Sequence, residues 1–162
     1  MSRENVSTRR VELHTHSTAS DGAYAPERLA EKIAESGAEI WALTDHDNCD
    51  GCARAARAAQ NHGIEFLPGI EISAYRERSI HVLGLGVDPE SEVIQGLSSR
   101  LYEARRRRMR EMLSELEGLD VKITFEQVEA FADGSPLSRA HLSEALVAHG
   151  PVETRDEAFE RF

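Results

Sequence analysis

The sequence predicts an α/β fold in which helices cover a sheet of β-strands, with a helical subdomain attached. Between residues 10 and 88, short apolar runs alternate with helical segments in a β-α-β-α-β order. The runs are almost continuously apolar, as in parallel strands buried on both faces, so a parallel sheet or barrel is expected. After Asp88-Pro89 the pattern is helical. We therefore divide the chain into a βα part, residues 1–89, and a helical insertion, residues 90–162.

The first part is expected to contain four strands and two helices. The strands are expected at residues 10–15, 40–44, 66–73 and 79–86, and the helices at 26–36 and 53–62. Pro26 suits the first turn of a helix, and Leu29 and Ile33 are spaced to lie on one face of it. Gly37 and Gly63 follow the two helices, where a glycine commonly ends one.

The second part is expected to contain one long helix and three shorter ones. The long helix is expected at residues 90–117, before Gly118. Thr124 with Gln127 forms the capping-box pattern of a helix that continues to Ala132. Further helices are expected from Ser135-Pro136 to Gly150, and after Thr154, whose capping partner is Glu157.

Composition and charge restrict the class of protein. The 162 residues contain 19 Lys and Arg against 29 Asp and Glu, a net charge of −10, which argues against a nucleic-acid binder that uses its whole surface. The sequence has no apolar run of about 18 residues and no apolar signal core near the N-terminus, so a cytoplasmic protein without a membrane partner is expected. The only cysteines, Cys49 and Cys52, lack the context of a zinc site or a redox motif and are expected to be reduced and incidental.

Histidines and carboxylates recur at the ends of the expected strands. His14 and His16 are two apart, so both imidazoles would face the same side with their Cα atoms roughly 6–7 Å apart, a spacing that suits one metal ion. Taken alone, the pair could equally be two solvent-facing histidines. However, Asp21 follows in the next loop, His46 follows the second strand, and further candidates lie on the third and fourth strands, at Glu71 and His81.

The apolar surroundings of Glu71 strengthen the metal hypothesis. An unpaired carboxylate there would cost several kcal/mol, so a cation is its natural partner, and a carboxylate can also bridge two metals. The carboxyl ends of parallel strands share one rim, where sites assemble. Asp45 and Asp47, beside His46, either orient imidazoles from a second layer or cap the following helix. The recurrence predicts a centre for two or three divalent cations.

These motifs resemble the polymerase and histidinol phosphatase (PHP) domain family. The resemblance is carried by His14-Thr15-His16-Ser17 with Asp21-Gly22, by Thr44-Asp45-His46-Asp47, by Gly69-Ile70-Glu71-Ile72-Ser73 and, more softly, by Ser138-Arg139-Ala140-His141. It implies a distorted (β/α)7 barrel, to which this chain supplies the N-terminal strands. It also implies that His14, His16 and Glu71 hold one metal, that Glu71, His81 and His141 hold a second, and that Asp21 and His46 serve a third.

The same resemblance implies the chemistry. The protein is expected to be a metal-dependent phosphoesterase of the small branch, which acts on nucleoside 3′,5′-bisphosphates or on the 5′ end of short RNA. A water molecule activated at the metal centre would be the nucleophile, and Arg139 would bind substrate phosphate. Mixed nitrogen and oxygen ligands favour Mn²⁺, Fe²⁺ or Zn²⁺ over Mg²⁺, with Mn²⁺ the first expectation. The alternatives are a histidinol-phosphate phosphatase and a non-catalytic PHP module.

Two features leave alternatives open. The arginines at positions 100, 105–108 and 110 either form a solvated face that pairs with Glu103, Glu111 and Glu115, or direct one or two side chains to the metal rim. His141 on a helix beside Leu142 would more often be structural, and only the resemblance favours a ligand. The family also supplies an Asp-x-His motif near its C-terminus, which is not found before Phe162. The barrel is therefore expected to be completed either by a further segment or by self-association.

Overall fold

The computed structural model describes residues 8–76 and 78–162. Its first part contains β1 (Val11–Glu12), α1 (Pro26–Ser36), β2 (Ile40–Leu43), α2 (Cys52–Asn61), β3 (Glu65–Arg76) and β4 (Arg78–Leu85). The four strands form one sheet in the order β1-β2-β3-β4. Both predicted helices are present, and α1 has its predicted bounds, with Pro26 in the first turn and Gly37 in the left-handed conformation at its end.

The direction of β4 corrects the expectation of a parallel sheet. The pairs β1–β2 and β2–β3 are parallel, but β3 and β4 form an antiparallel hairpin in which Glu71 pairs with Leu83 and Ser73 with His81. The physical reason is the short connection, because a parallel crossover needs a dozen or more residues whereas a hairpin needs only a few. The sheet is therefore mixed, and His81 lies within a hairpin strand instead of at a parallel rim.

The second part contains α3 (Glu92–Glu117), α4 (Phe125–Ala132), α5 (Arg139–His149) and α6 (Arg155–Arg161). The predicted capping box is present in α4, where the Thr124 hydroxyl accepts from the Gln127 amide. At α6, Thr154 accepts from the Glu157 amide, as its sequence pattern predicts. The prediction for α5 was wrong at its start: the helix begins after Ser138, and the Ser135-Pro136 segment is a buried loop.

Two separate groups of buried apolar side chains stabilise the fold. One lies between α1, α2 and the sheet and is centred on Trp41, Leu43 and the alanines of α2. The other lies among α3 to α6 and is centred on Val128, Leu142 and Leu146. Each part of the chain thus buries its own apolar surface.

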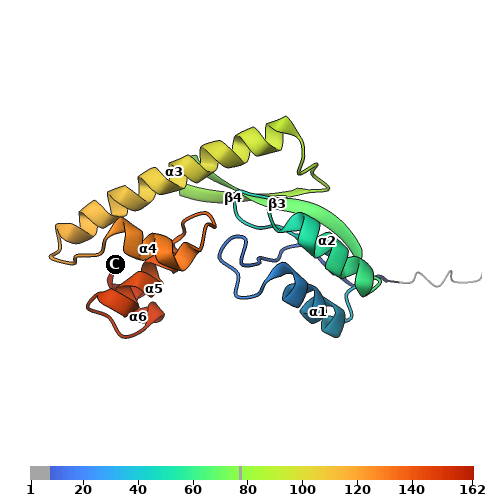
Figure 1. Cartoon of the computed structure of the whole chain (residues 1–162), viewed down its shortest axis with the longest axis horizontal. Helices are drawn as coiled ribbons and strands as arrows, with labels where there is room; N and C mark the ends of the chain where they lie inside the picture. Colours follow the sequence, from blue (N-terminus) through green and yellow to red (C-terminus); the bar gives the residue numbers. More distant parts are fainter. Residues whose placement is uncertain (1–7, 77) are drawn as a thin grey trace, which may run out of the picture.

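The long helix α3 joins the two parts in space. Figure 1 shows α3 running beside the β3–β4 hairpin, with α4, α5 and α6 under its C-terminal half and α1 and α2 at the other end of the molecule. The loop after β1 and the start of α5 line one cleft between these two groups of helices. Within residues 8–76 and 78–162, none of the helices combines the length and the apolarity needed to span a membrane.

Candidate metal centre

Four imidazoles surround the carboxylate of Glu71. The Nε2 atoms of His14 and His16 each lie 2.9 Å from Oε2, and Nδ1 of His81 lies 2.7 Å from Oε1. His46 approaches Oε2 with its Nδ1 at 3.5 Å. The residue is only 4% exposed, so this carboxylate is withdrawn from water and depends on the imidazoles or on cations for stabilisation.

Backbone and side-chain bonds to β2 hold the segment that carries His14 and His16. Thr15, between them, donates through Oγ1 to the Ala42 carbonyl at 2.9 Å and accepts from Trp41 Nε1 at 2.8 Å. Because neighbouring residues of an extended chain point to opposite sides, fixing Thr15 against β2 directs both histidines to the other side, towards Glu71. A two-residue strand is therefore enough to place them.

Pairing within the sheet places the other two histidines. His46 follows β2 and forms an isolated parallel bridge with Glu71. His81 pairs with Ser73, two residues beyond Glu71 on β3, so its imidazole lies diagonally across the hairpin from that carboxylate.

Asp21 faces the same cluster from the loop after β1. Its Oδ1 lies 3.8 Å from His16 Nδ1 and its Oδ2 lies 3.8 Å from His46 Nε2. The loop returns close to its own start at Gly22, where a Cβ atom would lie 2.2 Å from the His16 carbonyl oxygen. Only glycine fits at that point.

Asp45 holds the loop after β1 in place through hydrogen bonds. The carboxylate is 1% exposed and accepts from the Ser17 amide and hydroxyl, both at 2.7 Å, and from the Ser20 hydroxyl at 2.6 Å. Burial raises the pKa of Asp45, while the hydrogen bonds from Ser20 and Ser17 oppose that rise. Asp45 thus holds the loop that presents Asp21; its hydrogen bonds go to serines and not to an imidazole.

The cluster has the donor set of a metal centre. Three groups of ligand atoms each lie within 4.8 Å of one another: His14, His16 and Glu71; His16, Asp21 and His46; and His46, Glu71 and His81. The buried Nδ1 atoms of His16 and His46 have no hydrogen-bond partner among the described residues. Buried polar atoms normally find a partner, and neutral imidazole nitrogens beside carboxylates are suitable ligands for divalent transition metals. The residues therefore fit such cations.

The charges in the cluster are coupled. Burial would raise the pKa of Glu71, but the hydrogen bond from His14, the charge of His46 and the hydrogen bond from His81 together lower it. Burial lowers the pKa of His46, as does nearby Arg105, while Asp21 opposes the fall. An ionised Glu71 and a neutral His46 are the states that bind a cation.

His141 lies beside the cluster and not within it. It is 8% exposed and lines, together with Asp21, a cleft of about 710 Å³ to which Arg54, Phe131 and Arg155 also contribute. Its Nδ1 lies 3.2 Å from the Ser138 amide and 3.5 Å from the Ser138 hydroxyl. Burial lowers the pKa of His141, as does the charge of Arg105, whereas Asp21 raises it. Its assignment as a ligand with Glu71 and His81 stays a prediction.

The arginine run is divided between buried and solvated positions. Arg105 reaches the surroundings of the cluster, where it pairs with the buried Asp47. Arg106 pairs with Glu129 and lies over the Phe125 ring, and Arg107 and Arg108 are exposed. The described ion pairs of this run thus do not involve the three glutamates of the same helix. The sequence could not single out Arg105, because its neighbours are also arginines.

Neither Arg139 nor Asp47 belongs to the three groups of candidate ligand atoms found among the described residues. Arg139 is exposed and lies 5.0 Å from the Phe159 ring centroid, beside a small cavity among the C-terminal helices. Asp47 Oδ1 accepts from the Ser73 amide at 2.6 Å, and α2 begins without a side-chain cap. Asp47 therefore ties the loop after β2 to β3 and does not cap the helix.

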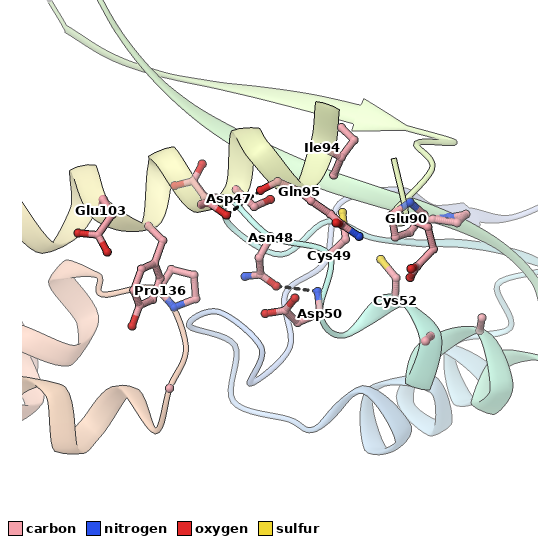
Figure 2. Close-up of a pocket in the computed structure, with 18 of the residues that line it drawn as sticks. Asp47, Asn48, Cys49, Asp50, Cys52, Glu90, Ile94, Gln95, Glu103 and Pro136 are labelled. Atoms are coloured by element: carbon pink, nitrogen blue, oxygen red, sulfur yellow. Dashed lines mark hydrogen bonds between the residues drawn. The ribbon is translucent and has the colours of Figure 1, made fainter. Parts of the chain in front are cut away.

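The two cysteines are free and lie outside the three ligand groups. Both sulfur atoms approach the Gly69 carbonyl oxygen, at 3.5 and 3.6 Å. They line a cavity of about 870 Å³ together with Asp47, Asn48, Ile94 and Gln95. Figure 2 shows the two cysteines on the opposite side of this cavity from Pro136.

Comparison with known proteins identifies what this arrangement is similar to. The sequence profile of the PHP domain matches residues 12–162. The chain is 36% identical over 155 residues to a 3′,5′-nucleoside bisphosphate phosphatase of Chromobacterium violaceum, covering 94% of this chain and 54% of that protein. It is also 36% identical over 156 residues to a 5′-3′ exoribonuclease of Haemophilus influenzae, covering 96% of this chain and 57% of that protein.

A solved structure shares the fold. A protein of Bifidobacterium adolescentis, provisionally named a metal-dependent phosphoesterase, superposes with a TM-score of 0.83 at 33% identity, over 94% of this chain and 55% of that one. The chain spans about half the length of the relatives it matches. The similarity bears out the predicted fold class, corrected by the antiparallel β4.

Proposed function

This chain belongs to the PHP domain family, and on that premise we propose that the protein is a metal-dependent phosphoesterase. The observation that most strongly supports this proposal is that four imidazoles lie within 3.5 Å of the oxygens of the buried Glu71 carboxylate. A salt-bridged structural carboxylate needs one or two partners, whereas this one is surrounded by groups that share its ability to bind a cation. The curated relatives named above include a nucleotide phosphatase and an exoribonuclease, which agrees with this class of reaction.

We assign the ligands as the family motifs imply. His14, His16 and Glu71 hold one cation, Glu71, His81 and His141 hold a second, and Asp21 and His46 serve a third. The three groups of ligand atoms support the parts of this assignment that do not include His141. Two or three divalent cations bound there would activate a water molecule and offset the charge of the phosphoryl oxygens. Mn²⁺ suits the mixed nitrogen and oxygen ligands, as do Fe²⁺ and Zn²⁺.

The residues of the chain supply the remaining steps. The second layer, Asp45 and Asp47, keeps the ligand loops in place, so the cluster is formed before substrate arrives. The cleft beside Asp21 admits the substrate. Arg54 and Arg155 lie on its wall, where they pair with Glu27 and Glu144, and they would bind phosphate oxygens by exchanging these carboxylates for them. The proposed substrate is a nucleoside 3′,5′-bisphosphate or the 5′ end of a short RNA, in the cytoplasm. The role of Arg139 in binding phosphate stays a prediction.

Metal content and substrate preference test the proposal together. Protein prepared without a metal-binding tag and incubated with Mn²⁺ should retain at least about one equivalent after gel filtration. We expect its kcat/KM for adenosine 3′,5′-bisphosphate to exceed that for histidinol phosphate by about tenfold, roughly 1.4 kcal/mol of discrimination. Metal-free protein without turnover of any phosphate ester would refute the proposal. Equal rates on the two substrates would leave a phosphatase of broader specificity.

A further inference from the structure

Cys49 and Cys52 are the two ends of one tight turn. The Cys52 amide closes the turn by donating to the Cys49 carbonyl at 3.0 Å, and Cys52 is the first residue of α2. The Cα atoms at the ends of such a turn lie less than about 7 Å apart, and disulfide bonds usually join Cα atoms that are about 4.4–6.8 Å apart. The backbone therefore holds the two cysteines at a separation that a disulfide bond can span.

The two thiols leave the turn on the same side. Sγ of Cys49 lies 3.5 Å from the Gly69 carbonyl oxygen, and Sγ of Cys52 lies 3.6 Å from the same atom. Cys52 is buried and Cys49 is half-buried, and both line the cavity of about 870 Å³. A cavity of that volume has room for a small oxidant, since a water molecule occupies only about 30 Å³.

Packing fixes the turn before any reaction takes place. A Cβ atom at Gly51 would lie 2.8 Å from Leu43 Cδ2 and 2.9 Å from Asp45 Oδ2, so the middle of the turn lies close against the end of β2. Asn48, which precedes the turn, accepts through Oδ1 from the Asp50 amide at 2.9 Å. Because the turn is already ordered, joining the two sulfur atoms costs little further conformational entropy.

The two thiols differ in acidity. A hydrogen bond between them raises the pKa of Cys49 and lowers the pKa of Cys52, whereas burial raises the pKa of both. Cys52 also lies at the N-terminus of α2, where the helix dipole favours a thiolate. Cys52 is therefore the thiol of the pair that ionises first, and Cys49 is the one that keeps its proton.

We propose that Cys49 and Cys52 form a reversible disulfide bond within the chain when the protein is exposed to hydrogen peroxide. The Cys52 thiolate attacks one peroxide oxygen and the O–O bond breaks, which leaves a sulfenic acid on Cys52 and a hydroxide ion that takes up the proton lost by Cys52. The Cys49 sulfur then attacks the Cys52 sulfur and the S–O bond breaks, so that the hydroxyl group leaves with the Cys49 proton as a second water molecule. The two sulfur atoms are oxidised and the two peroxide oxygens are reduced. A dithiol reverses the reaction by thiol–disulfide exchange.

This disulfide site is independent of the metal centre, and the proposal replaces the expectation from the sequence that the two cysteines are incidental. Disulfide bonds of cytosolic proteins are usually transient and respond to oxidants, which agrees with a reversible pair. The oxidised pair has no S–H donor, so both contacts with the Gly69 carbonyl would be lost, two residues before Glu71.

The test treats the folded wild-type protein with hydrogen peroxide in the presence of chelator, alkylates the remaining thiols in denaturant and measures the mass of the tryptic peptide 33–54. This peptide contains both cysteines. We expect it to escape alkylation, to weigh about two hydrogen atoms less than the reduced peptide and to regain both alkylation sites after dithiothreitol. The protein should remain a monomer on a non-reducing gel. In Cys49→Ser, dimedone should capture a sulfenic acid on Cys52.

Contrary results overturn the proposal in distinct ways. Both thiols may remain open to alkylation at a peroxide concentration that consumes glutathione, and then the pair is not a site of oxidation. Disulfide-linked dimers, or a peptide that gains oxygen atoms on both cysteines and is not restored by dithiothreitol, would also overturn the disulfide within the chain. A sulfenic acid captured on Cys49 in Cys52→Ser but not on Cys52 in Cys49→Ser would overturn the assignment of Cys52 as the attacking thiolate. Each of these results leaves the phosphoesterase proposal unaffected.

Discussion

Replacing Glu71 with glutamine should remove most of the stabilisation that metal gives to this protein. The substitution keeps the shape of the side chain but removes its charge and turns one ligand oxygen into an NH₂ donor that faces imidazoles. Oε2 lies 2.9 Å from both His14 and His16, and Oε1 lies 2.7 Å from His81. Glu71 belongs to two of the three ligand groups, so more than one cation position loses a ligand.

The magnitude follows from mass action. A cation present at about 100 times its Kd stabilises the native state by about 2.7 kcal/mol, and a chain of this size gains about 2–4 °C in Tm per kcal/mol. Wild-type protein should therefore gain about 5–11 °C on adding metal. If Glu71→Gln weakens binding about a hundredfold, the same metal concentration gives it only about 0.4 kcal/mol, or about 1–2 °C.

The assay is thermal unfolding in chelator and at a fixed Mn²⁺ concentration, with elemental analysis of the same samples. Glu65→Gln is the matched control, since Glu65 lies on the same strand but is exposed and pairs with Arg9. It should keep the full metal-dependent rise in Tm. The reasoning is refuted if Glu71→Gln and wild-type protein show the same rise and the same metal content.

Two further predictions concern the support of the cluster and its pH dependence. Asp45→Ala leaves the Ser17 amide and hydroxyl and the Ser20 hydroxyl without their buried acceptor, so urea unfolding should show a loss of about 2–4 kcal/mol; a loss within experimental error would contradict this. Burial lowers the pKa of His46 in the folded protein, so the unfolded chain binds a proton at this residue more readily than the folded one does. The free energy of unfolding of metal-free protein should therefore keep the whole contribution of His46 above pH about 6.5 and lose it as the pH falls below that value. The urea midpoint should fall less steeply with pH in His46→Gln than in wild type, whereas exposed His62→Gln should follow wild type; identical slopes in all three proteins would argue against this.

The sequence predicted the helices better than the direction of the strands. Capping residues such as Thr124 and Thr154 mark a helix start locally, so these predictions needed no tertiary information. The direction of β4 depends on the length of a connection, and alternation of apolar residues is the same for parallel and antiparallel strands. The Ser135-Pro136 signal failed because Ser138, three residues later, is also a good N-cap, and the intervening loop is held by Arg105.

The residues of the cluster could be predicted from their type and their position relative to the strands. The residues that hold the cluster in place could not be predicted from the sequence. Five residues of the cluster could be selected because polar groups lie at or near the ends of apolar strands, and the structure brings these five together. They are His14, His16, His46, Glu71 and His81. Their supporting contacts come from residues distant in sequence. The bond from Arg105 to Leu137 spans 32 residues, and nothing in the local pattern of either residue indicates it.

The two separate apolar cores have a consequence for how such proteins diversify. The six candidate ligands belong to the part built on Trp41 and Leu43, whereas one wall of the cleft is built on the core around Val128 and Leu146. Substitutions that repack the helical core would change the shape offered to a substrate without disturbing the ligand set. Mutational drift should then be tolerated more readily in α4 and α6 than around β2. A deep mutational scan scored separately for metal retention and for turnover should show that retention is sensitive mainly in the first part, and turnover in both.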